Sequence, residues 1–261
     1  METQTKPKIT MITATYNSEK MLGRAIDSVL AQNYSNLEYI LIDGGSTDGT
    51  VELINSYGDR ITRWISEPDR GISDAFNKGI GLSTGDVIGI INSDDGLEPG
   101  ALQAVADAFD PSVDVYRGKL LLWSEKNDVK AVEKPSMVLN LMNTNHIDHP
   151  STFIARKAYE KFGCYDITLK YAMDYDLLLR FQNGGAKFFY VDKTLAFFTL
   201  GGVSSTVQYS SQNMEEIERV LRQNGGSSWN VFCFRFIKRL KKLITRFLDK
   251  EKQLRWKKEA Y

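Results

Sequence analysis

Continuous apolar runs of strand length recur through the first hundred residues of the chain. Such runs indicate strands buried on both faces, and they occupy residues 8–15, 37–43, 61–66 and 86–92. The segments between them repeat apolar residues every three or four positions, as helices do, at 18–32, 47–57 and 72–83. Ser18 stands where an N-cap of the first helix is expected. Strands alternating with helices predict parallel β-α-β units with right-handed crossovers.

The pattern changes after residue 95. Further helices are predicted at 100–109, 136–142, 172–182 and 214–223. Further strands are predicted at 113–123, 129–132 and 149–155, the first two as an antiparallel pair. Residues 187–191 and 194–200 are expected to form a hairpin around Asp192-Lys193, followed by a flexible loop at Gly201-Gly202. We therefore expect an α/β protein with a mostly parallel central sheet flanked by helices.

The last part of the chain has a composition of its own. Residues 224–228 resemble a linker, and apolar residues then recur at helical spacing from 229 to 248. Residues 229–261 carry 11 Lys and Arg against 3 Asp and Glu, a net charge of +8, whereas the rest of the chain carries −8. One interpretation is a helix in a membrane interface, with contacts from Trp229, Phe232, Phe236, Arg239 and Lys242. The other is an amphipathic helix that packs on its own domain.

Composition narrows the classes of protein to which the chain can belong. A hydrophobic content of 42% in 261 residues suffices for a large core. The two cysteines and two histidines do not make a zinc site, and the cysteines are expected to stay reduced. The first residues are polar, and no run reaches the roughly 20 apolar residues that span a bilayer. We expect a cytoplasmic protein, and we expect no nucleic-acid partner.

The segment Asn92-Ser93-Asp94-Asp95 is the most informative motif. It follows the apolar run 87–91, at the carboxyl end of a predicted parallel strand, which is where open α/β sheets bind ligands. Adjacent carboxylates there can hold a hard divalent cation together with substrate phosphates. The same residues, followed by Gly96, also make a good surface turn, so the motif alone supports both interpretations.

Polar and small residues follow the other predicted strands as well. They occupy 13–17, 43–50, 67–71 and 92–95, and in a parallel sheet these four segments meet along one edge. The crevice that they form is the size of a nucleotide. No Gly-x-Gly-x-x-Gly follows the first strand, which disfavours a dinucleotide-binding fold, and the absence of Gly-Lys-Ser/Thr excludes a P-loop.

Together, these segments resemble the family 2 glycosyltransferases, which have the GT-A fold. The resemblance is carried by residues 12–17, 28–32, 39–50, 69–79 and 84–95. It then weakens until 149–153 and returns in 163–180, which contains Met173-Asp174-Tyr175-Asp176-Leu177. It covers residues 8–205 and implies a GT-A catalytic domain over 1–224. Its donor-binding half would comprise about 8–98 and its acceptor half about 99–224, before the linker and basic amphipathic helix of 225–261.

The resemblance also implies roles for individual residues. The donor would be a nucleotide-diphosphate sugar, in this family most often a uridine diphosphate sugar. It would be bound by Thr13, Ala14, Thr15, Tyr16, Asn17, Asp43, Gly44, Arg70, Asp74, Asn77, Asn92, Ser93 and Asp94. Asp95, together with Asp94, would hold Mn²⁺ or Mg²⁺.

Two of these positions leave alternatives open. Gly44 stands where the family more commonly has an acid that faces the base, so the identity of the base is open. Arg70 would meet the diphosphate with its planar fork of donors, or would form a surface ion pair with Asp69 or Asp74.

Transfer requires a carboxylate that takes the proton of the attacking acceptor hydroxyl. Asp174 matches the second acid of an acidic pair in the family, and Met173 replaces the first. It is expected in the first turn of a helix, where the dipole favours the ionised form, although this place also suits a simple helix cap. Asp176 is the reserve candidate for the base. His149 is expected on the acceptor or diphosphate side, or else as a structural histidine.

The resemblance thus implies an inverting, metal-dependent transfer of a sugar to a hydroxyl of a glycan or a lipid-linked oligosaccharide, as in surface polysaccharide assembly. The tail would dock the enzyme on the inner face of the membrane. One alternative is a catalytically inactive nucleotide-sugar-binding or scaffold protein, against which Asp95 and Asp174 argue. Another is a sugar nucleotidyltransferase, which usually carries a Gly-rich signature near its first strand that this sequence lacks.

Overall fold

The computed structural model describes residues 6–124, 129–135, 137, 149–200 and 211–236. Within these residues the chain forms one mixed sheet of nine strands in the order β3-β2-β1-β4-β8-β6-β9-β5, with β7 paired to β6 outside this path. The strands are β1 (Ile9–Thr15), β2 (Leu37–Asp43), β3 (Arg63–Ser66), β4 (Val87–Asn92), β5 (Gly96–Leu97), β6 (Val115–Ser124), β7 (Val129–Glu133), β8 (Thr152–Ala155) and β9 (Phe188–Thr199). The predicted α/β class is confirmed.

Strands β3, β2, β1 and β4 are parallel and end level with one another. Their register pairs Ser66 with Asp43, Asp43 with Thr15, and Ala14 with Asn92. Every residue of β1 is buried because helices cover both faces of this part of the sheet, which explains its apolar sequence. The polar segments that follow the four strands therefore lie along one edge, as the sequence predicted.

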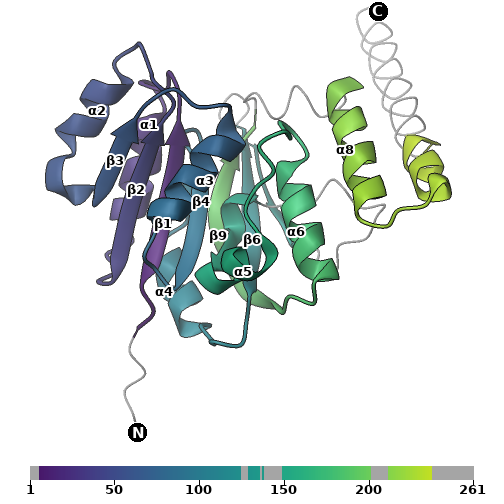
Figure 1. Cartoon of the computed structure of the whole chain (residues 1–261). Helices are drawn as coiled ribbons and strands as arrows, with labels where there is room; N and C mark the ends of the chain where they lie inside the picture. The colour runs from purple at the N-terminus through teal and green to yellow at the C-terminus, as the bar shows by residue number, and fades with distance from the viewer. Residues whose placement is uncertain (1–5, 125–128, 136, 138–148, 201–210, 237–261) are drawn as a thin grey trace, which may run out of the picture.

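Helices cover both faces of the sheet (Figure 1). One face carries α3 (Ile72–Leu82), α5 (Arg156–Phe162), α6 (Met173–Asn183) and α8 (Ser211–Gln223). The other carries α1 (Leu22–Leu30), α2 (Thr50–Ser56) and α4 (Ala101–Asp107). The close approach of α3 to β1 depends on Gly79, because a Cβ at that position would lie 2.6 Å from Cγ2 of Ile12.

The predicted hairpin at 187–200 is wrong. This segment is the single strand β9, which runs parallel to β6. Asp192 and Lys193 do not turn the chain; they lie where the register with β6 is irregular, and the Asp192 carboxylate pairs with Nζ of Lys119 at 2.6 Å. Pairing with a distant strand has overridden the local turn preference of this dipeptide.

Smaller differences concern the ends of elements. The predicted strand 149–155 begins as a short 3-10 helix, η2 (His149–Ser151), and a second such turn, η1 (Gly58–Arg60), follows α2. No element was predicted where α5 lies. Helix α1 begins at Leu22 without a side-chain cap, and the Ser18 hydroxyl instead hydrogen-bonds that of Ser93 at 2.9 Å. The predicted helix 136–142, apart from residue 137, and the Gly201-Gly202 loop fall outside the described residues.

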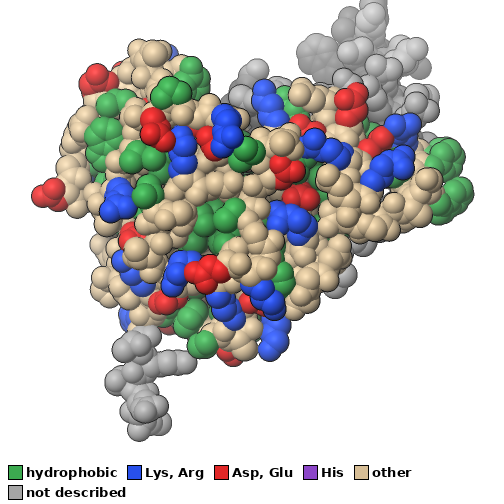
Figure 2. All heavy atoms as spheres, viewed as in Figure 1, with side chains coloured by type: hydrophobic (Ala, Val, Ile, Leu, Met, Phe, Trp, Pro, Cys, Tyr) green, Lys and Arg blue, Asp and Glu red, His purple; other side chains and the backbone are tan. Residues whose placement is uncertain are grey.

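A short helix at 228–236 follows α8 and packs against it. Val231 and Phe234 of this helix are buried in the same apolar cluster as α6 and α8, and Arg235 pairs with Glu218 of α8. The opposite side exposes three aromatic rings that stack along the helix, those of Trp229, Phe232 and Phe236. Figure 2 shows hydrophobic side chains gathered at the right edge of the molecule, where Figure 1 places this helix. None of the helices in the described part of the chain is long and apolar enough to cross a membrane.

A buried carboxylate ties β2 to the segments that precede β1 and β4. Glu38 accepts hydrogen bonds from the Thr10 hydroxyl at 2.6 Å and from the amide and hydroxyl of Thr84 at 2.7 Å each, and it pairs with Nζ of Lys8 at 3.0 Å. Burial alone would raise its pKa, but these donors outweigh that effect and lower the pKa of Glu38 to about 2.

Replacing this carboxylate should change how stability depends on pH. Because the folded pKa lies below the ordinary 4.5, the wild-type group stabilises the fold above that pH and loses its contribution as the pH falls toward 2. Glu38→Gln should lower the free energy of unfolding near neutral pH by roughly 2–3 kcal/mol and should flatten its decline on acidification. Urea unfolding between about pH 7 and pH 3 measures both effects.

Glu160→Gln is the matched control, since Glu160 forms an exposed ion pair with Arg156 and should matter little. An unchanged acid profile of Glu38→Gln would contradict the role of Glu38.

Candidate functional site

We call the residues that follow the level ends of the parallel strands, 15–17, 43–50, 66–71 and 92–95, the polar edge. Tyr16 projects from it with 60% of its surface exposed. Beside it, Oγ1 of Thr15 and Oδ1 of Asn92 are buried and have no hydrogen-bond partner. Thr13 does not reach this surface, because it is fully buried with its hydroxyl 3.0 Å from that of Tyr39. Unpartnered buried polar atoms are rare in folded proteins and mark a place for water, an ion or a ligand.

Asp43 is fully buried and shapes the loop that follows β2. Its Oδ2 accepts hydrogen bonds from the amides of Gly45 (3.1 Å) and Ser46 (2.9 Å) and from the hydroxyl of Ser66 (2.6 Å). Its Oδ1 accepts one from the Ser46 hydroxyl. The contacts of Asp43 are thus within the polar edge, and they order the loop on which other residues are carried.

Three further predicted donor residues have partners within the fold. Ala14 is buried in the core, and the Ser93 hydroxyl meets that of Ser18. Asn17 adopts a left-handed backbone conformation with φ of 47°, and its Oδ1 accepts a hydrogen bond of 2.9 Å from the Thr47 amide. Asn17 thereby joins the loop after β1 to the loop after β2.

Arg70 extends from the polar edge into solvent, with 71% of its side chain exposed. Its guanidinium pairs with Asp74 at 3.0 Å, and its amide donates to the other oxygen of the same carboxylate at 3.1 Å. The hydrogen bond from Arg70 lowers the pKa of Asp74. Of the two alternatives for Arg70, the ion pair with Asp74 is thus present in the structure. Asp74 holds the Arg70 side chain at the exposed side of the polar edge.

Asp95 is fully buried behind the turn that ends β4. Its Oδ1 accepts a hydrogen bond of 3.2 Å from the Thr199 amide, and its Oδ2 one of 3.3 Å from Asn92. Burial and the neighbouring Asp94 raise the pKa of Asp95 well above its ordinary range. Burial also raises the pKa of Asp94, whose carbonyl accepts a hydrogen bond of 2.9 Å from Arg24.

These atoms fit a hard divalent cation. Two adjacent carboxylates with raised pKa values would be stabilised by positive charge, and the unpartnered Oδ1 of Asn92 adds a further oxygen at the same turn. Over the described ranges, no three His, Cys, Asp or Glu side chains are grouped so that they could hold a metal. A cation would therefore have to complete its coordination with oxygens of substrate and water.

A second group of polar residues lies in a small pocket between β4, β8 and α6. The pocket is lined by Ile90, His149, Thr152, Ile154, Tyr159, Tyr165, Asp174, Leu177 and Leu178. Oδ1 of Asp174 and Nε2 of His149 are buried and unpartnered. Burial raises the pKa of Asp174, opposed by the nearby His149 and by a hydrogen bond from the Tyr165 hydroxyl. The fold thus brings together Asp174 and His149, which are 25 positions apart in the chain.

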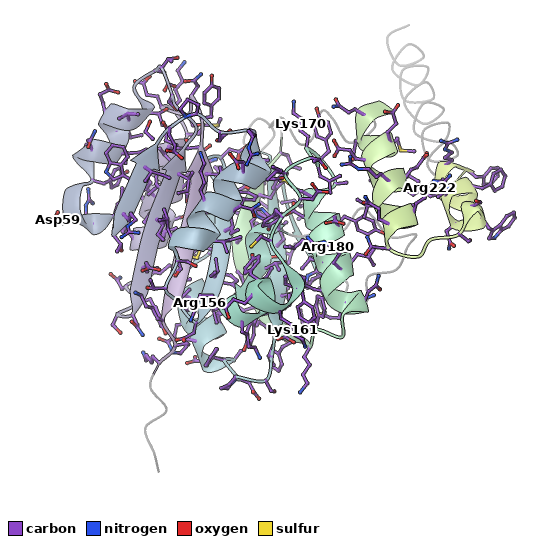
Figure 3. The ribbon with its side chains drawn as sticks, in the orientation of Figure 1. Asp59, Arg156, Lys161, Lys170, Arg180 and Arg222 are labelled. Carbon is purple, nitrogen blue, oxygen red and sulfur yellow. The ribbon has the colours of Figure 1, made fainter. Side chains whose placement is uncertain are left out.

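Asp176 belongs to a different environment. Its carboxylate accepts a hydrogen bond of 2.8 Å from Nε of Arg180, which also donates to the carbonyls of Phe162 (2.8 Å) and Cys164 (2.7 Å). Arg180 is labelled on α6 in Figure 3. The ion pair lies within α6, and the two hydrogen bonds to carbonyls join α6 to the end of α5 and the residues after it. Of the two acids at the start of α6, Asp174 is therefore the one that lines the pocket.

Two residues of α3 support the side chains that line the pocket, which was not predicted from the sequence. Phe76 stacks on His149 with ring centroids 5.1 Å apart and also contacts the ring of Tyr165 at 5.3 Å. Asn77, which was predicted to bind the donor, exchanges two hydrogen bonds with the backbone of Tyr165, at 2.9 and 3.0 Å. These contacts set the position of the hydroxyl that faces Asp174.

Glu216 of α8 is the main functional candidate that sequence reasoning missed. One oxygen of its buried carboxylate accepts hydrogen bonds from the amides of Lys170 (3.0 Å), Tyr171 (2.7 Å) and Ala172 (3.1 Å), immediately before α6. Figure 3 labels Lys170 in this segment, beside α8. Glu216 thus satisfies amides at the start of the helix that carries Asp174. Nothing in the sequence distinguishes it from the exposed acid Glu215.

Removing Glu216 should loosen the first turn of α6. Glu216→Ala leaves three amides without their acceptor and should cost roughly 1–3 kcal/mol of stability. Amide hydrogen exchange at residues 170–172 should accelerate by about tenfold or more. Glu216→Gln, which keeps one acceptor oxygen, should show a smaller effect, and Glu215→Ala should show none. Equal exchange in all three variants would contradict this assignment.

Comparison with known proteins places the chain in a family. The sequence model described as glycosyl transferase family 2 matches residues 10–163, more than half of the chain. An uncharacterized glycosyltransferase of Rickettsia typhi is 29% identical over 195 residues, which are 70% of this chain and 61% of that protein. A glycosyltransferase of PGL/p-HBAD biosynthesis from Mycobacterium bovis is 27% identical over 215 residues, 77% of this chain and 80% of that protein. The chain thus spans less than two thirds of the Rickettsia relative.

Solved structures share the fold. TarS 1-349 of S. aureus, in complex with UDP-GlcNAc, superposes with a TM-score of 0.67 at 20% identity, covering 83% of this chain and 65% of that one. The mannosyltransferase PcManGT of Pyrobaculum calidifontis, in complex with GDP-Man and Mn²⁺, gives a TM-score of 0.62 at 17% identity over the same shares. The GT-A type of fold expected from the sequence is confirmed. The chain belongs to glycosyl transferase family 2.

Proposed function

We propose that the protein is an inverting glycosyltransferase that moves a sugar from a nucleotide-diphosphate donor, bound at the polar edge, to an acceptor hydroxyl presented to Asp174. The observation that carries this proposal is the Asp174 carboxylate, which is buried in a pocket with one unpartnered oxygen. Ile90 also lines this pocket and lies two residues before Asn92 of the polar edge, so the pocket and the edge are neighbours along β4. Solved proteins of the same fold bind UDP-GlcNAc and GDP-Man, which supports a donor of this chemical class.

The polar edge offers the groups that such a donor needs. The exposed ring of Tyr16 can stack on a base, and the exposed guanidinium of Arg70 can exchange its partner Asp74 for a diphosphate. Mn²⁺ or Mg²⁺, held by Asp94 and Asp95 when bound, would stabilise the charge that develops on the leaving diphosphate. The Mn²⁺ in the mannosyltransferase of similar fold supports this cofactor.

Asp174 would act as the general base. Transfer with inversion requires the acceptor hydroxyl to attack from the face opposite the leaving group while its proton passes to the enzyme. Burial raises the pKa of Asp174, which makes its carboxylate a stronger base, and the Tyr165 hydroxyl holds that carboxylate in place. His149, whose Nε2 is also unpartnered in the pocket, would hydrogen-bond the acceptor. Acidification through the pKa of Asp174 should therefore reduce the rate.

Asp174→Asn should separate donor binding from transfer. The amide keeps the shape of the side chain but cannot accept a proton, so transfer should fall by about 10²–10⁴-fold. Donor binding should stay within about twofold of the wild type, because Asp174 lies outside the polar edge. The donor is found first from the rise in melting temperature that each nucleotide sugar produces with Mn²⁺, and release of its nucleoside diphosphate in the presence of glycan acceptors then measures the rate.

Asp95→Ala provides the contrast in the same assays. It should lose the Mn²⁺-dependent part of donor binding, which Asp174→Asn retains. A wild-type protein that binds no nucleotide sugar would contradict the proposed function. Binding without any transfer would instead favour a nucleotide-sugar-binding or scaffold protein, and full activity of Asp174→Asn would remove Asp174 as the base.

We further propose that the acceptor is a glycan or lipid-linked oligosaccharide at the inner face of the membrane, where the helix at 228–236 docks the enzyme. Support comes from the three exposed aromatic rings of this helix and from the Lys- and Arg-rich sequence after it. Val231 and Phe234 hold the helix to the domain, so that the rings project as a fixed group. Arg239 and Lys242, proposed as further contacts, lie outside the described residues.

Binding to lipid vesicles tests this docking. The triple variant Trp229→Ser, Phe232→Ser, Phe236→Ser should lose at least about 100-fold in affinity for phosphatidylglycerol vesicles, since each ring would bury apolar surface worth about 1–2 kcal/mol. Its melting temperature should change little, because the three rings face outward. Phe189→Ser is the control, as Phe189 is an exposed aromatic residue of β9. Vesicle sedimentation that is equal for all proteins would contradict the proposal.

A further inference from the structure

Gly44 at the polar edge is in contact with a carboxylate from another loop. A Cβ built on Gly44 would lie 2.6 Å from Oδ2 and 3.3 Å from Cγ of Asp69, and 3.4 Å from the ring of Tyr16. A side chain at position 44 would thus have to displace Asp69. The loop after β3 has placed an acid in the space where a residue on the loop after β2 would otherwise project.

The carboxylate of Asp69 is held in place by one of its oxygens, and the other can still accept a hydrogen bond. Its Oδ1 accepts a hydrogen bond of 2.8 Å from the Gly71 amide, which fixes the side chain in the turn ahead of α3. No hydrogen bond to its Oδ2 is found among the described residues. Asp69 is half-buried and forms no ion pair within the described part of the chain, whereas its neighbours Glu67 and Arg70 both do.

Asp43 is less available than Asp69 to accept a hydrogen bond from a ligand. Its two oxygens together accept four hydrogen bonds from the polar edge itself, and its side chain is fully buried. Beside Gly44 and the exposed ring of Tyr16, Oδ2 of Asp69 is therefore the carboxylate oxygen without a hydrogen bond among the described residues, whereas the unpartnered oxygens of Thr15 and Asn92 are buried. An aromatic ring with a carboxylate at its side is suited to binding a nucleobase. The ring can stack on the base, and the carboxylate can accept a hydrogen bond from an N–H at the edge of the base.

We propose that Asp69 reads the base of the donor, in place of an acid at position 44. The inference rests on the proposed function, because it assumes that the polar edge binds a nucleoside diphosphate. A carboxylate accepts from the imino N–H of uracil (N3) or guanine (N1). The corresponding ring nitrogen of cytosine (N3) or adenine (N1) carries a lone pair that would face the negative oxygen. The ligand is thus a nucleoside diphosphate whose base carries an imino N–H.

Asp69→Asn tests this assignment with little change in shape. Oδ1 of the asparagine still accepts from the Gly71 amide, while its NH₂ group replaces Oδ2 and turns the acceptor into a donor. Calorimetry with UDP, CDP, GDP and ADP in the presence of Mn²⁺ measures the effect on the full chain. The wild type should bind UDP better than CDP, or GDP better than ADP, by about tenfold or more. In Asp69→Asn the affinity ratio of UDP to CDP, or of GDP to ADP, should fall at least about tenfold.

Gly44→Ala probes the same contact from the other side, because the added methyl group must push the Asp69 carboxylate away. It should also reduce the ratio while leaving the charge of the site unchanged. Glu160→Gln is the control, since Glu160 lies outside the polar edge, in an exposed ion pair with Arg156, and the ratio of this variant should equal that of the wild type.

The outcomes separate this inference from the proposed function. A wild type that binds none of the four nucleotides would overturn both. A wild type that discriminates between the paired bases, together with an Asp69→Asn variant that discriminates equally well, would overturn the role of Asp69 and leave the glycosyltransferase intact. A wild type that binds all four equally would likewise remove Asp69 as a reader of the base.

Discussion

The level register of four parallel strands is the constraint on which the rest of the protein depends. Backbone hydrogen bonds pair β3, β2, β1 and β4 so that Ser66, Asp43, Thr15 and Asn92 lie at one edge. The apolar residues of these strands can adopt this register because helices bury both faces of the sheet. A shift of one residue in any strand would turn its core side chains to the wrong face and would move its polar segment out of line.

Three buried carboxylates of the protein lie in three different environments. Asp43 is buried and accepts hydrogen bonds from its own loop, so it builds the site. Asp95 is buried beside Asp94 with a raised pKa, an arrangement that positive charge would stabilise. Asp174 keeps one oxygen without a partner in the pocket that it shares with His149 and Tyr165, which is costly in a folded protein unless a ligand or water makes use of it. The three residues are of one type but lie in different environments, and under the proposed function this difference separates an acid that builds the site from acids that act on the substrate.

The second half of the sheet and the helices on it place the pocket relative to the edge. Phe76 and Asn77 of α3 position His149 and Tyr165, and Glu216 of α8 holds the amides ahead of α6. These contacts join residues that are 44 to 88 positions apart in the chain, from Glu216 and Ala172 to Asn77 and Tyr165. Local sequence patterns carry no information about such pairs, because each partner alone is compatible with an ordinary exposed or buried position.

By itself, the sequence determined the alternation of strands and helices, the parallel half of the sheet and the polar segments at its edge, since these follow from the periodicity of apolar residues and from turn chemistry. Its resemblance to a known family also singled out Asp174 as a candidate base and His149 as a candidate residue of the acceptor or diphosphate side. It did not predict that β9 is one strand, that Asp176 pairs with Arg180, or that Asp69 fills the space beside Gly44. Tertiary structure decided these, because each depends on which distant groups compete for the same acceptor or the same volume, and that competition exists only once the chain has folded.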